Sequence, residues 1–270
     1  MSNHKFGNLI KKIKRGFLIW KTLILLLGNL WLDNLKFKIF RTNKDKKNKV
    51  QIKRAKWFTN KLIELGSAFI KIGQLLSARP DLIPNTWIQE LSKLQDQVPQ
   101  FSYAKVEEII KKELGDKFSE INQITSTPIG SASLAQVHKA TLKDGKEVVF
   151  KVQRPNLKNL FIIDLNIMQQ IAYILQKNKN WSRGRNWVEI AKEFRKVLMK
   201  ELDFNCEAQY AARFRQQFLD DKNIDVPEVI WNLSSEKVLC LSYLDGTKIS
   251  DIEKLKAKNC LLYTSPSPRD

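Results

Sequence analysis

Histidine and cysteine are scarce in this chain of 270 residues, which contains two histidines and three cysteines. Cys206, Cys240 and Cys260 show no metal-ligand spacing, and two histidines are too few for a zinc site or a histidine-based catalytic site. Three cysteines also make no disulfide framework, so a reduced cytosolic setting is expected. His138 lies in an expected strand, where we expect a packing or surface residue rather than a base.

Acidic side chains are also in short supply, and the deficit lies at one end of the chain. The sequence has 47 Lys plus Arg against 28 Asp plus Glu, which gives a formal net charge of +19. Residues 1–60 hold 16 basic and 2 acidic side chains, so most of the excess belongs to an N-terminal arm. This arm lacks the interleaved aromatic and basic residues that suit base stacking, so a nucleic-acid partner is disfavoured.

The arm also lacks an uninterrupted hydrophobic run of the length that a bilayer requires. Residues 17–32 read FLIWKTLILLLGNLWL, and this run of about sixteen residues is shorter than the roughly 20 needed to span. No small-residue cleavage site follows, which argues against a secretory signal. An interfacial helix is favoured, with Trp20 and Trp31 at the headgroup boundary, and a core helix of the same domain is the competing interpretation. The basic residues beside the run are Lys11, Lys12, Lys14 and Arg15. We therefore expect a membrane surface as partner, at the cytoplasmic face of a membrane.

The rest of the chain shows mainly helical patterns around one hairpin, and no internal repeat. Residues 41–56 are almost wholly polar and are expected to form a solvated linker or a surface helix. Apolar spacing and breaker residues predict helices over residues 57–78, 88–94, 103–114, 157–176, 186–219 and 249–258. Strands are predicted over residues 134–141, 148–152, 226–231 and 238–242, which would form a small antiparallel sheet.

The segment from Pro128 to Pro155 carries the clearest chemical signal. Small residues let a backbone approach phosphate oxygens closely, and four follow one another here: Gly130, Ser131, Ala132 and Ser133. Asp144-Gly145 between two apolar runs predicts a two-residue hairpin turn, because glycine adopts the positive φ that such a turn requires. The segment is typical of a hairpin that covers a ligand's phosphates.

Lys151 lies inside the second strand of this hairpin, between Phe150 and Val152. An ammonium in such an apolar run needs a nearby anion to offset its desolvation. A nucleotide phosphate together with a glutamate from a helix would supply it. A lysine that points to water is the alternative that the segment alone leaves open.

Two further motifs lie on either side of the hairpin. Upstream, FIKIGQLLSARPDLIP places Lys71, Gln74 and Ala78 at helical spacing, and downstream KELDFNCEAQYAARF carries Glu201, Asp203 and Glu207. With the small-residue loop, these KxGQ and ExD motifs resemble the UbiB-like atypical kinases, also called AarF-domain kinases, which act in isoprenoid-quinone biosynthesis. The resemblance covers roughly residues 57–257.

This resemblance implies an α+β fold of the protein-kinase-like N-lobe type, a small antiparallel sheet plus a long helix, with a helical extension that carries KxGQ. The strand lysine of a kinase pairs with a glutamate of the following helix and holds the α- and β-phosphates, which maps to Lys151 and Glu207. Glu201 would pair with Lys71 over the site, and Asp203 would lie close to the phosphates or to a metal. On one regular helix Glu201 and Glu207 point about 240° apart, so they would serve different lysines. Gln74 belongs to the same expected site.

The nucleotide itself would be held by the hairpin loop and by a hinge at residues 238–246. The expected cofactor-binding residues are Gly130, Ser131, Ala132, Ser133, Val137, Lys151, Leu241 and Tyr243. Gly130 and Ser131 stand where many relatives have alanines. Leu241 and Ser242 stand where a bulky residue followed by an acid is typical of the family. The expected cofactors are ATP or ADP and Mg²⁺.

The end of the chain lacks the catalytic-loop aspartate, its asparagine and the metal-binding aspartate that phosphoryl transfer requires. The last residues, CLLYTSPSPRD, match one reading frame of a transposase-type sequencing adapter, so a truncated gene model with most of the C-lobe missing is expected. A natural Ser/Pro tail is the alternative. The expected organisation is a membrane-associating arm at 1–40, a linker at 41–56, the KxGQ extension at 57–125, the N-lobe and hinge at 126–249, the start of the C-lobe at 250–259 and an adapter-derived tail at 260–270.

Together these features predict an ATP-binding atypical kinase or ATPase that acts at a membrane in quinone biosynthesis. A quinone precursor or the quinone-synthesis enzymes would be its partners. In this family the KxGQ helix covers the place where a peptide would lie, which implies action on small molecules or lipids. A non-catalytic, nucleotide-dependent scaffold and an ordinary protein kinase are the alternatives.

Overall fold

The computed structural model describes residues 2–40, 43–94, 100–178, 182–247, 249 and 252–258, with the side chains of residues 2–12 and 44 excepted. The helices are α1 (Ser2–Ile39), α2 (Lys44–Leu65), α3 (Ser67–Ser77), α4 (Asn85–Leu91), α5 (Tyr103–Leu114), α6 (Leu157–Lys177), α8 (Trp187–Glu201), α9 (Phe204–Gln217) and α10 (Ile252–Ala257). The strands are β1 (Ile121–Ile124), β2 (Gly130–Ser131), β3 (Ala135–Leu142), β4 (Glu147–Gln153) and β5 (Val238–Ser242), and 3₁₀ turns cover Gly115–Glu120 and Trp231–Leu233.

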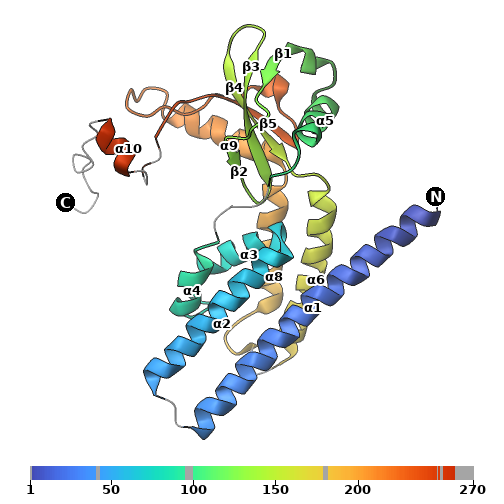
Figure 1. Ribbon diagram of the computed structural model, residues 1–270, viewed down its shortest axis with the longest axis vertical. Coiled ribbons are helices and arrows are strands. Elements are labelled where there is room, and N and C mark those ends of the chain that lie inside the picture. The colour runs from blue at the N-terminus through green and yellow to red at the C-terminus, as the bar shows by residue number, and fades with distance from the viewer. Residues whose placement is uncertain are drawn as a thin grey trace.

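The molecule has a helical part and a sheet part, which Figure 1 shows at opposite ends. The helical part contains α1, α2, α3, α4, α6 and α8 around one apolar core. The sheet is antiparallel in the order β1-β3-β4-β5, with β2 also paired to β3. This arrangement confirms the predicted α+β class.

The β3–β4 hairpin forms as predicted, with a longer connection. Val137 lies opposite Lys151, and the last strand pair joins Thr141 to Glu147. The amide of Leu142 then donates to the carbonyl of Lys146 at 3.0 Å, so three residues lie between the paired positions where two were predicted. Gly145 has φ +86°, the positive value expected of a glycine in this turn.

The two faces of the sheet have different partners. Val148, Phe150 and Val152 alternate onto one fully buried face, and they pack in a core with α5. Lys151 alternates onto the other face, where Phe204 of α9 packs against the strands. The boundary expected at residues 125/126 therefore divides elements that share a core, because α5 and β1 belong with the sheet.

Two of the predicted helices are each divided in two, and one predicted strand does not form. The single helix predicted over 57–78 is broken at Gly66, whose φ of +88° ends α2 and lets α3 start in a new direction. The single helix predicted over 186–219 is broken between Glu201 and Phe204. Residues 226–231, predicted as a strand, form one isolated bridge between Val229 and Leu241.

Most of the polar segment at 41–56 is helical, because residues 44–56 form the first half of α2, and Asn43 precedes the helix as its N-cap. The helix predicted over 249–258 is seen over Ile252–Ala257. The expected adapter-derived tail at 260–270, with Cys260, lies outside the described residues.

Candidate functional site

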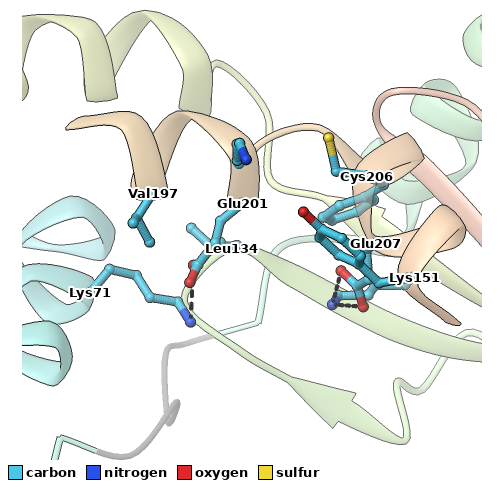
Figure 2. A pocket seen from close by; sticks show the side chains of 10 residues that line it. Lys71, Leu134, Lys151, Val197, Glu201, Cys206 and Glu207 are labelled. Atoms are coloured by element: carbon cyan, nitrogen blue, oxygen red, sulfur yellow. Dashed lines mark hydrogen bonds and ion pairs between the residues drawn. The ribbon is translucent and has the colours of Figure 1, made fainter. Parts of the chain in front are cut away.

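A hollow of about 420 Å³ lies where the helical part meets the sheet. Its lining residues come from α3, the loop before β3, β4, α8 and α9: Lys71, Leu134, Lys151, Val197, Lys200, Glu201, Phe204, Cys206, Glu207 and Tyr210. Small-molecule sites typically have volumes of about 300 to 1,000 Å³. Figure 2 shows four of the five charged members of this set in two separate pairs, Lys71 with Glu201 and Lys151 with Glu207.

The first pair joins Lys151 to Glu207. The Lys151 Nζ donates to both carboxylate oxygens of Glu207, at 2.6 and 2.7 Å. The ammonium of this β4 residue is therefore held by helix α9, which packs on the same face of the sheet. Nζ also lies 5.1 Å from the centroid of the Phe204 ring, within the range of a cation–π contact. The side chains of Lys151 and Glu207 are 28% and 44% exposed, which leaves the pair accessible from the hollow.

The second pair joins Lys71 to Glu201, with Nζ 3.2 Å from Oε2. Lys71 reaches in from the KxGQ helix α3, and Glu201 is the last residue of α8. The structure therefore brings together the two lysines and the two glutamates in the pairs that the sequence predicts. What these pairs do for a ligand stays a prediction.

The break between α8 and α9 explains how two glutamates so close in sequence serve different lysines. Asp203 caps α9, because its Oδ1 accepts from the amide of Asn205 at 2.9 Å. The buried amide of Gln153 donates to the Leu202 carbonyl at 2.7 Å, which fixes this break against β4. The sequence-based calculation of 240° on one regular helix does not apply, since each glutamate belongs to its own helix.

Lys71, Gly73 and Gln74 of the KxGQ motif have three different surroundings. Lys71 faces the hollow, whereas the side-chain amide of Gln74 donates to the Leu94 carbonyl at 2.8 Å. Gly73 faces α2 and α4, where a Cβ would lie only 2.3 Å from Leu94 and 2.8 Å from Leu62. Gln74, expected in the site, therefore lies outside the lining of the hollow and holds α3 in place.

The small-residue loop is held down by Arg154, which sequence reasoning did not single out. Its Nε donates to the Ala132 carbonyl at 3.0 Å and its Nη2 to Ser131 Oγ at 3.1 Å. The Leu134 carbonyl also accepts from the Arg154 amide at 2.9 Å. The guanidinium stacks over the Phe101 ring, and burial lowers the pKa of Arg154. The loop is thereby a braced structure rather than a free flap.

Several expected cofactor residues lie beside the hollow rather than in its wall. Of the loop, Leu134 lines it, whereas Gly130, Ser131, Ala132 and Ser133 do not. Gly130 and Lys151 both lie opposite Val137, which is likewise absent from the lining.

The expected hinge residues and Asp203 are absent from the lining too. Leu241 pairs with Val149 on the sheet, and the Tyr243 ring lies under the Lys139 ammonium, with Nζ 4.0 Å from its centroid. Asp203 points its carboxylate at its own helix. Within the described residues no group of three or more His, Cys, Asp or Glu could hold a metal.

The lining residues that the sequence prediction missed have a simple pattern. Val197 and Tyr210 lie four residues before Glu201 and three after Glu207, so they share a helix face with the two acids. Lys200 and Cys206 are sequence neighbours of those acids. Extending the helical spacing outward from each glutamate would have found Val197 and Tyr210.

His138 and Cys240 behave as core residues. His138 is 1% exposed, its Nδ1 lies 2.8 Å from the Thr125 carbonyl, and burial lowers its pKa. Burial raises the pKa of the Cys240 thiol to about 12. Neither side chain lines the hollow.

An antiparallel sheet whose strand lysine is held by a helix glutamate is the arrangement found in the amino-terminal lobe of a protein-kinase-like fold. Residues 93–263 match the family model described as the ABC1 atypical kinase-like domain. The chain belongs to the ABC1/UbiB atypical kinase family. This family was identified from the sequence motifs, and that identification is confirmed.

Relatives and a solved structure extend the match across most of the chain. An uncharacterized protein of Synechocystis sp. is 42% identical over 90% of this chain and 42% of its own length. The Arabidopsis thaliana chloroplastic protein ACTIVITY OF BC1 COMPLEX KINASE 7 is 40% identical over 91% of this chain and 36% of its own. The Shewanella denitrificans protein named Probable protein kinase UbiB is 36% identical over 82% and 40%. The chain thus spans about two fifths of the length of these relatives.

The solved structure of the Rv3197–erythromycin complex from Mycobacterium tuberculosis has a similar fold. It superimposes with a TM-score of 0.52 at 30% identity, over 78% of this chain and 54% of that one. The shared fold supports the kinase-like assignment of the sheet and its helices.

Proposed function

We propose that this chain provides the nucleotide-binding lobe of an ATP-dependent atypical kinase or ATPase that acts at a membrane, in the synthesis of isoprenoid quinones or its regulation. The observation that carries the proposal is the bidentate Lys151–Glu207 pair at the wall of a hollow of about 420 Å³. In kinase-like lobes such a lysine holds the α- and β-phosphates of ATP.

Charge at the hollow suits an anionic ligand. Three lysines, Lys71, Lys151 and Lys200, line it together with two glutamates, Glu201 and Glu207. Glu201 is already paired with Lys71, and Glu207 with Lys151. Among the described residues no carboxylate forms an ion pair with Lys200. A nucleotide polyphosphate entering the hollow would therefore meet net positive charge.

The chemistry proposed for ATP here is positioning of its phosphates. Lys151 would hold them, Glu207 would keep Lys151 in place, and the loop braced by Arg154 would cover them. Mg²⁺ would be held mainly by the phosphates of the nucleotide, since it usually takes only one or two carboxylates from a protein. The quinone-related role and the membrane site rest on the family and on the apolar helix α1.

A small-molecule or lipid substrate is favoured over a peptide. The KxGQ helix α3 contributes Lys71 to one wall of the hollow, and it packs against α6 and α8 on that side. The family resemblance places a peptide substrate where this helix lies. We therefore propose that α3 leaves no open groove for a peptide substrate.

The test is nucleotide binding by the chain and its variants, measured by thermal shift and calorimetry with ATP and ADP. Lys151→Met and Glu207→Gln are expected to weaken binding about tenfold or more, since a charge-assisted contact to phosphate contributes roughly 1.5 to 3 kcal/mol. Lys146→Met removes a lysine of the β3–β4 turn from an exposed pair with Glu228, away from the hollow, and serves as the control. Unchanged affinity in both site variants would refute the site.

Turnover is a property proposed for the whole protein, because the chain covers about two fifths of its relatives' length. ATP hydrolysis on the complete gene product, with and without anionic vesicles that contain a quinone precursor, separates an enzyme from a scaffold. Nucleotide binding without any turnover would favour the scaffold.

A further inference from the structure

Helix α1 has two unlike faces, and one of them packs on the body of the protein. Ile19, Thr22, Leu26 and Asp33 are between 2% and 9% exposed, and Ile19 belongs to the main helical core. These residues recur at three, four and seven positions along α1, which places them on one side of the helix. Figure 1 shows α1 alongside α2 at the end of the molecule away from the sheet.

The opposite face of α1 is apolar and uncovered. Phe17, Ile24 and Trp31 are 69%, 65% and 64% exposed, and their spacing of seven residues aligns them in one stripe. Ile13 and Leu35 extend the stripe at both ends, at 62% and 40% exposed. The most apolar part of α1 is only 22% buried, whereas a core helix is mostly buried. The stripe therefore needs another explanation than the protein core.

Lysines border this stripe. Lys14, Lys21, Lys36 and Lys38 of α1 are exposed, and four exposed lysines follow on the adjoining helix α2: Lys46, Lys47, Lys49 and Lys53. An apolar stripe with basic borders is complementary to the surface of an anionic bilayer, with acyl chains under the stripe and phosphates beside the lysines.

A hollow of about 560 Å³ between α1 and α2 combines the same two chemistries. Trp31, Leu35 and Phe37 supply apolar walls, and Lys38 and Lys47 supply ammonium groups. The Lys47 Nζ lies 5.7 Å from the centroid of the Phe37 ring, so the charge is held at the apolar wall. A phosphate joined to an apolar neck, as in a phospholipid, matches this lining.

Two ion pairs decide how α1 would lie in such a membrane. Near one end, Arg15 donates to both oxygens of Asp164 on α6, at 2.8 and 2.7 Å, and to the Leu65 carbonyl. Near the other end, Arg54 of α2 donates to both oxygens of Asp33, at 2.6 and 3.1 Å. A spanning α1 would leave the fully buried Asp164 without its cation, which is costly. Arg15, expected at the lipid headgroups, is thus turned into the protein.

We propose that the α1–α2 hairpin is a docking surface for an anionic bilayer, with α1 lying in the plane of the interface and the hollow at Trp31, Lys38 and Lys47 receiving a lipid phosphate. This inference rests on the membrane part of the proposed function and gives it a surface and an orientation. Nucleotide binding does not depend on it, so the two can fail separately.

Co-sedimentation with vesicles of phosphatidylcholine and phosphatidylglycerol tests the surface. The triple variant Phe17→Gln, Ile24→Gln and Trp31→Gln is expected to lose affinity about a hundredfold, because three large apolar side chains no longer enter the membrane. The matched control changes three exposed apolar residues at the sheet end, Ile129→Gln, Leu219→Gln and Ile224→Gln, and should bind as the unmodified chain does. Equal binding by both triples, or no binding by the unmodified chain, overturns the proposal.

The headgroup hollow is tested by Lys38→Gln with Lys47→Gln. This pair is expected to lose about tenfold in affinity for the anionic vesicles and little for vesicles of phosphatidylcholine alone. Inorganic phosphate at matched ionic strength should not displace the chain from vesicles. Displacement by phosphate would identify the hollow as a free-phosphate site and overturn the assignment to lipid.

Orientation is tested with single cysteines at Lys14→Cys and Lys36→Cys in a background that carries Cys206→Ser and Cys260→Ser. The two positions lie about 33 Å apart along the helix, enough to reach both sides of a bilayer if α1 spans. A membrane-impermeant thiol reagent added outside the vesicles should label both cysteines when α1 lies in plane. Labelling of only one position would show a spanning helix. The ATP-induced thermal shift is followed in the triple variant and in the Lys38→Gln, Lys47→Gln variant, whose residues lie outside the lining of the hollow at Lys151, and it should stay unchanged. The two cysteine variants are compared only with their own Cys206→Ser, Cys260→Ser background.

Discussion

At the scale of single residues, the two lysine–glutamate pairs are better suited to holding a ligand than to holding the fold. All four side chains are between 20% and 44% exposed, and ion pairs with this access to water typically contribute less than about 1 kcal/mol to stability. The fold is stabilised elsewhere, by Phe150, Phe161 and Leu198 in the cores. Loss of either pair should therefore change ligand binding more than unfolding.

Cys206 offers a direct test of where a nucleotide binds. This free cysteine is half-buried and lines the hollow beside Glu207, whereas Cys240 is fully buried and burial raises its thiol pKa to about 12. We expect iodoacetamide to modify Cys206 in the folded chain and to spare Cys240. Saturating ATP should slow modification of Cys206 severalfold, as followed by peptide mass spectrometry.

The Lys151→Met variant is the control for this protection experiment. At an ATP concentration near the Kd of the unmodified chain, its Cys206 should be protected much less than that of the unmodified chain, because the phosphate-holding ammonium is gone. Equal protection of the two chains at that ATP concentration, or no protection of the unmodified chain at saturating ATP, would place the nucleotide elsewhere.

Arg154 is a second prediction at this scale. Arg154→Lys keeps the charge but cannot donate to both Ala132 and Ser131 from a planar group, so the loop should lose its brace. ATP affinity is expected to fall about three- to tenfold with a change in melting temperature of only a few degrees. Arg195→Lys changes a half-buried arginine outside the loop that donates to Asn166 and Gln169, and it serves as the control. A fall in melting temperature with unchanged affinity would make Arg154 a purely structural residue.

At the scale of helices and strands, Gly73 explains why the KxGQ motif contains a glycine. A Cβ there would lie 2.3 Å from Leu94 and 2.8 Å from Leu62, both almost fully buried, so α3 could not pack as closely on α2 and α4. Gly73→Ala should lower the free energy of unfolding by about 1 to 3 kcal/mol, as measured by urea denaturation.

Gly28→Ala is the matched control, because Gly28 is also helical and its Cβ would meet nothing within 4 Å. That change should be neutral or stabilising by up to about 1 kcal/mol, since alanine is the better helix former. Equal effects of the two substitutions would mean that Gly73 has no packing role.

Local patterns predicted the elements whose signals are contained in a few residues. The hairpin follows from Asp144-Gly145 between apolar runs, and α5 and β5 have the predicted bounds of residues 103–114 and 238–242. The breaks at Gly66 and Asp203 were missed because apolar spacing continues through both. Only packing partners, such as Gln153 on the Leu202 carbonyl, show that the chain turns there.

The sequence motifs predicted the two ion pairs of the candidate site but not the surroundings of its other residues. Charge pairing of Lys151 with Glu207 and of Lys71 with Glu201 could be inferred, because the family resemblance assigns each motif to a place. The position of Gln74 could not be inferred, since its side chain donates to the backbone carbonyl of Leu94, and no side-chain pattern indicates such a partner. The brace at Arg154 likewise depends on backbone acceptors in the loop.

At the scale of the whole molecule, the N-terminal arm is part of the body and not an appendage. Arg15 is the junction: its guanidinium reaches Asp164 on α6 and the end of α2, and it lies 5.7 Å from the ring of Phe69 on the KxGQ helix. The helix proposed to meet the membrane thus contacts α3, the helix that carries Lys71.

This junction gives the last prediction. Asp164→Ala leaves the Arg15 guanidinium partly buried without its anion, and breaking such a pair typically costs about 3 to 5 kcal/mol of unfolding free energy. Arg15→Met combined with Asp164→Leu should recover much of that loss, because neither charge then remains in the core. Glu236→Gln breaks the exposed pair with Lys158 and, as the control, should cost less than about 1 kcal/mol. If urea denaturation shows Asp164→Ala to be no more harmful than Glu236→Gln, α1 does not pack on α6 in solution and the in-plane orientation loses its anchor.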